Sequence, residues 1–217
     1  MRIHLPSLPA VLLTVARNQA RHAKMREFFA AHGYGNVQWI FGRPTENHHH
    51  GAREMAIDTL RSISAPTLWL EDDATPTEHY TDEIEVPDDA QAVYLGGSRL
   101  GSKKRAMRSL RRHHKRGMIS QVKKCLRGRR REKRRALYLD TPYRDWIQLV
   151  SMWTGHAILW LDDGLREAMA RLIEKYPHKC YDIAWADQQW RWRIYAARHP
   201  LFFQDDGHNR HTQRYCR

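Results

Sequence analysis

Short apolar runs, each closed by Gly, Pro or charged residues, recur along the first half of the chain. Four of them have the length and content of buried strands, and they cover 11–16, 37–41, 67–70 and 92–95. Two stretches with helical spacing lie between these runs, at 18–31 and 51–63. Strands that alternate with helices predict an α/β protein whose strands run parallel.

The second half of the chain continues with a mixed pattern. A further strand is expected at 156–161, and helices are expected at 164–176 and 182–190. Before them, the segment 99–136 carries a ragged helical stripe of apolar residues, which Gly117 is expected to split into two helices. The predicted organisation is one Rossmann-like α/β domain over 1–217, with 99–136 as a mainly helical insert within it.

Charge is unevenly distributed along the chain. It has 37 Lys and Arg against 24 Asp and Glu, a formal net charge of +13. The segment 99–136 holds 18 of those bases and one acid, Glu132, and so carries +17, whereas the remaining 19 bases and 23 acids give the rest of the chain −4. A mildly acidic body with one strongly basic segment is typical of a protein whose partner is a polyanion or an anionic surface.

Cysteine usage and hydropathy bear on the compartment. Three cysteines, at 125, 180 and 216, are odd in number and lack a zinc-type spacing, so neither a disulfide framework nor a zinc site is expected. No apolar run approaches the roughly 20 residues that a membrane-spanning helix needs. We therefore expect a protein of the reducing cytoplasm.

Three acids follow the third expected strand directly, in the string TLWLEDDATP at 67–76. Alternate side chains of an extended chain share a face, so Glu71 and Asp73 are expected to point one way and Asp72 the other. Two carboxylates on one face suit Mg²⁺ or Mn²⁺, which would neutralise a nucleotide diphosphate. In α/β sheets ligands bind beyond the carboxyl ends of the strands, where these acids are expected to lie. The simpler interpretation is that they solubilise the end of a strand.

The string LWLEDDA at 68–74 resembles the LEDDA-type signature of glycosyltransferase family 25. Members of that family transfer sugars from nucleotide-sugar donors with a metal ion, and they share a single-domain, Rossmann-like fold called GT-A. Other segments resemble family motifs in the same order, and they are LLTVARNQAR at 12–21, VYLGG at 93–97, TGHAIL at 154–159 and YDIAWADQQ at 181–189. The resemblance covers most of the chain outside 99–136.

This resemblance implies a set of roles. Glu71 and Asp73 would bind the metal, with His208 as a further ligand, and Asp187 would be the catalytic base of an inverting transfer, with Asp182 as the alternative. The residues expected to bind the nucleotide-sugar are Thr14, Arg17, Arg21, Asp72, Gly96 and Gly155. The arginines suit phosphate, and the glycines allow a ligand to approach the backbone closely. A solvated helix face and ordinary turns are the alternative interpretations.

The basic insert predicts a nucleic-acid interface. It contains no aromatic residue, so contact with the phosphates of duplex DNA fits better than stacking on single-stranded bases. The basic residues expected to contact DNA are Lys103, Lys104, Arg105, Arg108, Arg111, Arg112, Lys115, Arg116, Lys123, Lys124, Arg129 and Arg130. Attraction of the insert to anionic lipid is the alternative.

Together these features predict an enzyme that glycosylates DNA. The substrates would be a nucleotide-sugar, most simply a UDP-sugar, and duplex DNA with hydroxymethylated pyrimidines, as found in some bacteriophages, so the location would be the host cytoplasm if a phage encodes the chain. Such a base would be flipped out of the duplex. Tryptophans that could stack on it are Trp146, Trp153, Trp185, Trp190 and Trp192. Two alternatives are a glycosyltransferase for glycans or lipopolysaccharide and a nucleic-acid-binding protein without activity.

Overall fold

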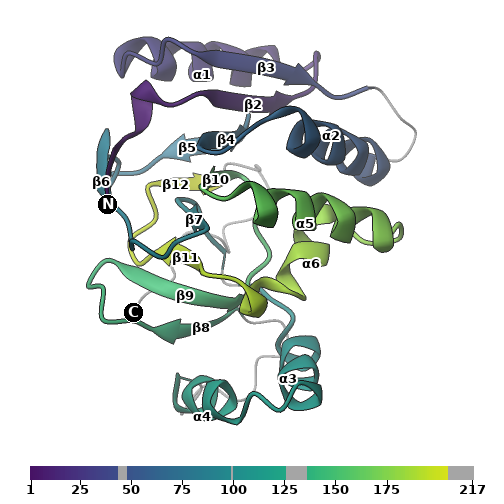
Figure 1. The fold of residues 1–217 in the computed structure, drawn as a ribbon. Coiled ribbons are helices and arrows are strands. Elements are labelled where there is room, and N and C mark those ends of the chain that lie inside the picture. Colours follow the sequence, from purple (N-terminus) through teal and green to yellow (C-terminus); the bar gives the residue numbers. More distant parts are fainter. Residues whose placement is uncertain (44–47, 99, 126–135, 205–217) are drawn as a thin grey trace.

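A mixed eight-stranded sheet forms the centre of the molecule (Figure 1). The computed structural model describes residues 1–43, 48–98, 100–125 and 136–204. The strands of the sheet are β2 (Ala10–Thr14), β3 (Val37–Phe41), β4 (Thr67–Glu71), β7 (Ala92–Tyr94), β8 (Leu137–Asp140), β9 (Trp146–Ser151), β10 (Ala157–Trp160) and β11 (Ile194–Ala197). Helices flank the sheet, so the α/β class predicted from the sequence is confirmed.

Strand direction decides which residues meet at the edge of the sheet. The order is β3-β2-β4-β10-β7-β11-β9-β8. Strand β2 is parallel to β3 and to β4, while β10 is antiparallel to both β4 and β7. Strands β4 and β7 therefore point the same way as β2, and the carboxyl ends of all three lie at one edge. Because β10 runs in the opposite direction, its first residue lies at that edge too.

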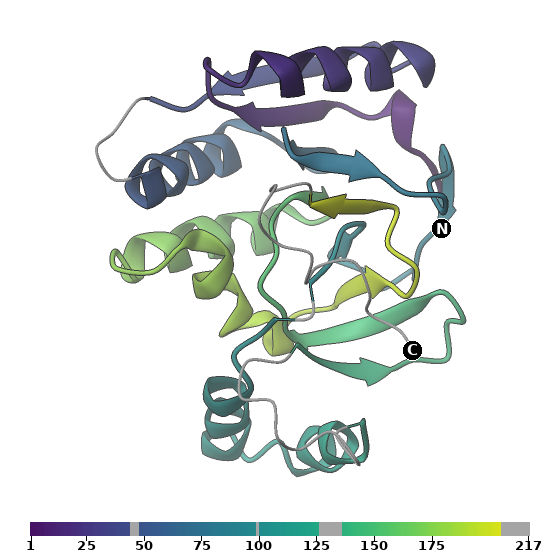
Figure 2. The ribbon, with the colours of Figure 1, turned by 180° about the vertical axis from the view of Figure 1, so that it is seen from behind.

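Side chains alternate between two faces of the sheet, and different helices cover each face. Helix α1 (Gln19–Ala31) packs on the face that presents Leu12, Leu68 and Leu70. Three helices cover the other face, where Val11 and Trp69 point, and they are α2 (His48–Ser62), α5 (Asp163–Lys175) and α6 (Tyr181–Ala186). Seen from behind, α1 lies in front of the sheet (Figure 2). The period-two alternation of the buried strands thus produces a three-layer arrangement.

Two small sheets complete the edges of the domain. One pairs β1 (Arg2–His4) with β6 (Glu83–Glu85), and the other pairs β5 (Ala74–Pro76) with β12 (Phe202–Gln204). Single-turn 3₁₀ helices occur at Leu5–Ser7 and Gln189–Arg191. The pairing of β12 with β5 matters for the site, because it carries the end of the described chain next to the acids that follow β4.

The basic insert forms two short helices, α3 (Lys103–Arg112) and α4 (Arg116–Cys125), beside β8 at one end of the sheet (Figure 1). Apolar side chains of these helices, Ala106, Leu110 and Val122, are buried with Leu137, Leu139, Val150 and Trp190. The helical insert is therefore confirmed for its described part, 100–125. The expected break at Gly117 is wrong, because the chain turns at 113–115 with His114 at a φ of 53°.

Among the described residues, no helix combines the length and the apolar character that crossing a bilayer would require.

Candidate active site

A cavity of about 510 Å³ opens at the edge where β2 and β4 end and β10 begins. Its walls come from both ends of the chain, including Thr14, Asn18, Glu71, Asp72, Trp153, Gly155, Tyr181, Asp182 and Gln204. We call this cavity the acidic pocket, because three of its lining side chains are carboxylates and none of its described lining residues is Lys or Arg. Its position matches the expectation for an open α/β sheet.

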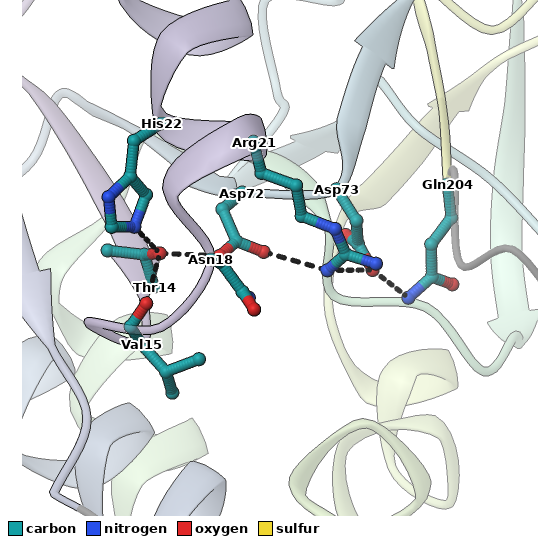
Figure 3. A network of polar contacts seen from close by, with 8 residues as sticks. All are labelled: Thr14, Val15, Asn18, Arg21, His22, Asp72, Asp73 and Gln204. Carbon is teal, nitrogen blue, oxygen red and sulfur yellow. Dashed lines mark hydrogen bonds and ion pairs between the residues drawn. The ribbon is translucent and has the colours of Figure 1, made fainter.

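Asp72 connects β4 to the start of α1 (Figure 3). Its Oδ2 accepts hydrogen bonds from the hydroxyl of Thr14 and from Nδ2 of Asn18, the latter at 2.7 Å. Its Oδ1 accepts from Nη1 of Arg21 at 3.0 Å. Asn18 precedes α1 as expected, yet its side chain bonds to Asp72 instead of capping the helix. Asp72 is therefore a buried acceptor that joins three segments.

A second layer supports this carboxylate. Nε2 of the buried His22 lies 2.7 Å from the hydroxyl oxygen of Thr14. The single hydrogen of that hydroxyl goes to Asp72, so the imidazole of His22 is the donor and carries its proton on Nε2. His22 in turn packs edge-on against Trp39 and Phe41 of β3. Three neighbouring elements, β2, α1 and β3, thus hold Asp72 in one orientation.

Asp73 lies on the other side of Arg21 (Figure 3). Its Oδ2 accepts from Nε2 of Gln204 at 3.1 Å and is 3.9 Å from Nη1 of Arg21. It lines a separate cavity of about 50 Å³, together with Arg21 and Lys24. Asp73 is thus turned toward β12 and α1, although it remains close enough to repel the carboxylate of Glu71.

The expected alternation of the three acids fails at this turn. Strand β4 ends at Glu71, and Asp72 and Asp73 belong to the turn into β5. Glu71 lines the acidic pocket, Asp73 lines the smaller cavity, and Asp72 lines both. Glu71 and Asp73 therefore do not share one cavity, because the period-two rule applies only while the backbone stays extended.

Glu71 carries an unsatisfied oxygen. Its Oε1 is buried and has no hydrogen-bond partner among the described residues. Burial raises the pKa of Glu71 well above its usual range, and repulsion from Asp73, Asp182 and Asp72 raises it further, opposed by Arg21. A buried carboxylate without a partner requires either a proton or a cation. The surroundings of Glu71 therefore fit a bound cation.

Asp182 faces the same pocket from the first turn of α6. One of its oxygens, Oδ1, accepts from the backbone N–H of Ile183 at 2.7 Å. Burial raises the pKa of Asp182 to about 6. A carboxylate with such a pKa is largely ionised at neutral pH yet more basic than an exposed aspartate, as a general base should be.

Asp187 does not line the acidic pocket. It is buried at the end of α6, where its Oδ2 lies 2.9 Å from Nζ of Lys179 and 3.4 Å from Nη1 of Arg105 in α3. Two cations thus hold one oxygen of this carboxylate. Of the two predicted candidates for the catalytic base, only Asp182 is brought to the pocket.

The remaining donor-site predictions divide into two groups. Gly155 lines the acidic pocket, and a Cβ there would lie 2.7 Å from the ring of Tyr181 and 3.1 Å from Oε1 of Glu71. Only glycine fits at that position. Gly96 lies outside the pocket lining and packs against the imidazole of His156. A Cβ added to Gly96 would lie 2.1 Å from Nε2 of that imidazole. Arg17 is exposed in the turn before α1, also outside the lining.

Several pocket residues were not predicted as ligand contacts. Tyr181 lies beside Asp182, and Sγ of Cys180 lies 3.2 Å from Nδ1 of His49 at the pocket rim. Gln204 comes from β12, which has no strand signal of its own. Of the five tryptophans considered for stacking, Trp153 lines the pocket, whereas Trp146, Trp185 and Trp190 are buried in the cores and Trp192 packs against one.

The expected metal set is incomplete in the described part of the chain. Within it, no three His, Cys, Asp or Glu side chains converge as a metal site would require. His208 lies outside the described residues. The unpartnered oxygen of Glu71 nevertheless fits Mg²⁺ or Mn²⁺, which usually take few protein ligands and complete their shells with water and phosphate oxygens.

The Lys and Arg side chains predicted to contact DNA form an exposed surface on α3 and α4. Nine of them are exposed, namely Lys104, Arg105, Arg108, Arg111, Arg112, Lys115, Arg116, Lys123 and Lys124, whereas Lys103 is half-buried. Arg129 and Arg130 lie outside the described residues. The insert is fastened to the pocket wall, because Nε1 of Trp153 donates to the hydroxyl of Ser102 at 2.8 Å and its backbone N–H donates to the carbonyl of Leu100 at 2.9 Å.

Comparison of the chain with protein-family models, with curated protein sequences and with solved structures finds no match.

Proposed function

We propose that this chain is a metal-dependent glycosyltransferase of the GT-A type, which moves a sugar from a UDP-sugar to the hydroxyl of a 5-hydroxymethylpyrimidine in duplex DNA. The observation that carries the proposal is the buried Oε1 of Glu71, which has no hydrogen-bond partner among the described residues and lies beside Asp182 in a pocket at the carboxyl edge of the sheet. A site with one buried carboxylate that a cation can neutralise and a second, basic carboxylate supplies what sugar transfer from a diphosphate needs.

The donor half of the proposal is supported by the size and the charge of the pocket. A cavity of about 510 Å³ lies within the usual range for small-molecule sites. Because Glu71, Asp72 and Asp182 line it, a diphosphate could enter only together with a cation. Glu71 would hold that ion from the wall of the acidic pocket, whereas Asp73 lines the smaller cavity. A bound Mg²⁺ or Mn²⁺ supplies positive charge to a leaving diphosphate.

On the acceptor side of the reaction, Asp182 is the general base. The acceptor hydroxyl oxygen forms a bond to the anomeric carbon of the sugar, while the bond from that carbon to the diphosphate oxygen breaks and the diphosphate leaves with the electron pair. The hydroxyl proton passes to the carboxylate of Asp182. Trp153 and Tyr181, which line the pocket, offer aromatic faces for the sugar or for a flipped base.

DNA as the acceptor is supported by the position of the basic insert. The insert begins at the pocket wall, where Ser102 and Leu100 bond to Trp153. Its exposed Lys and Arg side chains suit a phosphate backbone, while the pocket itself repels one. A duplex held by the insert would therefore be kept outside the pocket except for the reacting nucleotide.

The test is a transfer assay with UDP-glucose and Mn²⁺ on hydroxymethylated and on unmodified duplex DNA, read by mass spectrometry. We expect a hexose mass increase on the hydroxymethylated DNA only. Asp182→Asn should abolish transfer, whereas the matched variant Asp58→Asn, which removes an exposed acid of α2 outside the pocket lining, should retain it. Absence of both transfer and UDP-glucose hydrolysis with all nucleotide-sugars tried would refute an enzymatic function. Transfer that is retained in Asp182→Asn and lost in Asp187→Asn at unchanged affinity for DNA would make Asp187 the base.

A further inference from the structure

Helices α3 and α4 form a compact pair of basic helices with a tight turn between them. Each has ten residues, and three residues, 113–115, separate them. Ala106 and Leu110 of α3 and Val122 of α4 are fully buried against the edge of the sheet. Two helices joined by three or four residues and packed on a common core are the arrangement of helix-turn-helix units. The faces opposite the buried residues are open to solvent in both helices.

The exposed face of α3 is uniformly cationic. Its exposed side chains are Lys104, Arg105, Arg108, Arg111 and Arg112. These side chains are long and carry charge at their tips, which suits contact with phosphates at a distance from the helix axis. No side chain with both a donor and an acceptor is fully exposed on α3. This helix is therefore equipped for the DNA backbone, which carries no sequence information.

The exposed face of α4 has a different composition. Gly117, Ser120, Gln121 and Lys124 are all exposed and follow the i, i+3, i+4, i+7 spacing of a single helix face. Gly and Ser are small, so another surface can approach the helix closely along this line. Gln121 offers a paired donor and acceptor, the combination that recognises adenine in the major groove. Arg116 and Lys123, seven residues apart, stand together along one side of this face, where they could contact a phosphate strand.

We propose that α4 enters the major groove of duplex DNA and reads base edges through Gln121 and Ser120, while α3 binds the adjacent phosphates. The proposal rests on DNA being the acceptor in the proposed function, and it adds a choice of sequence to it. A ten-residue helix is about 15 Å long and about as wide as the major groove. It would span roughly four base pairs at 3.4 Å each. Transfer would then be directed to hydroxymethylated bases near a preferred sequence.

The first experiment selects duplexes from a randomised pool with the full chain and measures affinity by fluorescence anisotropy, without any nucleotide-sugar. We expect an enriched motif of about four base pairs. Gln121→Ala should lower affinity for that motif about tenfold, leave affinity for a scrambled duplex unchanged and leave the salt dependence unchanged. Gln38→Ala, which removes an exposed amide from β3 at the far edge of the sheet, is the matched control and should change neither affinity.

The second experiment removes charge from α3. The double variant Arg108→Ala/Arg111→Ala should weaken binding to all duplexes to the same extent. The slope of log affinity against log salt should become shallower by about 0.9 for each phosphate that the variant no longer neutralises. Arg171→Ala removes an exposed charge from α5 and should leave the slope unchanged. Thermal unfolding of each variant confirms that the fold is retained, because all of these side chains are exposed.

Four results would overturn the inference. The first is that the pool yields no enriched motif, and the second is that Gln121→Ala keeps the same motif at the same affinity. The third is equal affinity for duplex RNA, whose major groove is too narrow for a helix. The fourth is tighter binding to vesicles of anionic lipid than to DNA. Sugar transfer is scored separately. If a motif is enriched but no sugar is transferred, only the proposed enzymatic function is refuted. If sugar is transferred but no motif is enriched, only the sequence recognition by α4 is refuted.

Discussion

At the scale of single residues, three adjacent acids differ because the chain turns between them. Glu71, the last residue of a strand, lines the acidic pocket, and within the part of the chain that the structure describes its Oε1 has no hydrogen-bond partner. Asp72 is bound by three donors and fixes β4 to α1. Asp73 bonds to Gln204 beside Arg21 and lines the smaller cavity. Glu71 is therefore the acid best able to attract a cation into the acidic pocket.

One histidine behind the pocket gives a prediction for stability against pH. The carbonyl of His156 accepts from the N–H of Glu71 at 2.9 Å, and its Nδ1 is 2.7 Å from the hydroxyl of Thr154. Burial lowers the pKa of His156 to about 4, opposed by the backbone of Phe202. Above pH 6.5 both the folded and the unfolded state hold a neutral imidazole. As pH falls from 6.5 to 4 only the unfolded state takes up the proton, so the free energy of unfolding falls, by up to about 3 kcal/mol.

Urea denaturation of the wild type and of His156→Gln between pH 4 and 7.5 tests this. The difference between the two curves isolates His156, because the raised pKa of Asp182 acts in the opposite direction in both proteins. We expect the wild type to lose more stability than the variant as pH falls below 6.5. Parallel curves would mean that the pKa of His156 is the same in the folded and in the unfolded state.

At the scale of elements, the sequence predicted the strands at the β3 end of the sheet better than those at the β8 end. Strands β2, β3 and β4 and their helices have long apolar runs with clear ends, and they appear within about two residues of the predicted bounds. Strands β9, β11 and β12 were missed because β9 and β11 are buried on both faces almost throughout and so show no alternation, while β12 has only three residues. The insertion of antiparallel β10 between β4 and β7 depends on long-range pairing, which a local pattern does not encode.

The same limit applies to the site. The acids and Thr14 could be found from their place at the ends of strands, because strand ends predict ligand positions, whereas Gly155, which precedes β10, came from the resemblance of TGHAIL to a family motif. The direction in which each acid points could not, since it is set by the turn at Asp72 and by hydrogen bonds to α1 and β12. Asp187 shows the same effect, because its partners Arg105 and Lys179 come from separate segments.

Asp187 therefore gives a prediction about how the insert is attached. Its carboxylate holds Arg105 of α3 and the partly buried Lys179. Asp187→Asn should lower the free energy of unfolding by about 1 to 2 kcal/mol, a range reduced because Arg105 is largely exposed. Hydrogen exchange should become faster in α3 and unchanged in α1. Asp163→Asn, which removes an exposed acid paired with Arg166, is the control. Unchanged exchange in α3 would show that the apolar contacts alone hold the insert.

At the scale of the whole molecule, charge is separated in space as well as in sequence. The exposed Lys and Arg side chains of α3 and α4 lie beside β8, at the opposite end of the strand order from β3. The acidic pocket lies where β2, β4 and β10 meet. A polyanion is attracted to the insert and repelled by the pocket. The two proposed substrates are thus sorted by charge, with a duplex on the insert and a cation-bound diphosphate in the pocket.

This separation predicts that salt and metal affect the two ligands differently. If the insert neutralises six to ten phosphates, affinity for duplex DNA should fall about 10³- to 10⁵-fold between 50 and 200 mM salt. Affinity for UDP with Mn²⁺ should change less than about tenfold, because a contact inside a pocket is screened less. EDTA should abolish UDP binding, since a diphosphate alone would face Glu71, Asp72 and Asp182, and it should leave DNA binding intact. Anisotropy for DNA and calorimetry for UDP in the same buffers measure both. A parallel fall of the two affinities with salt, or UDP binding that survives EDTA, would mean that the diphosphate binds on the basic insert instead of in the acidic pocket.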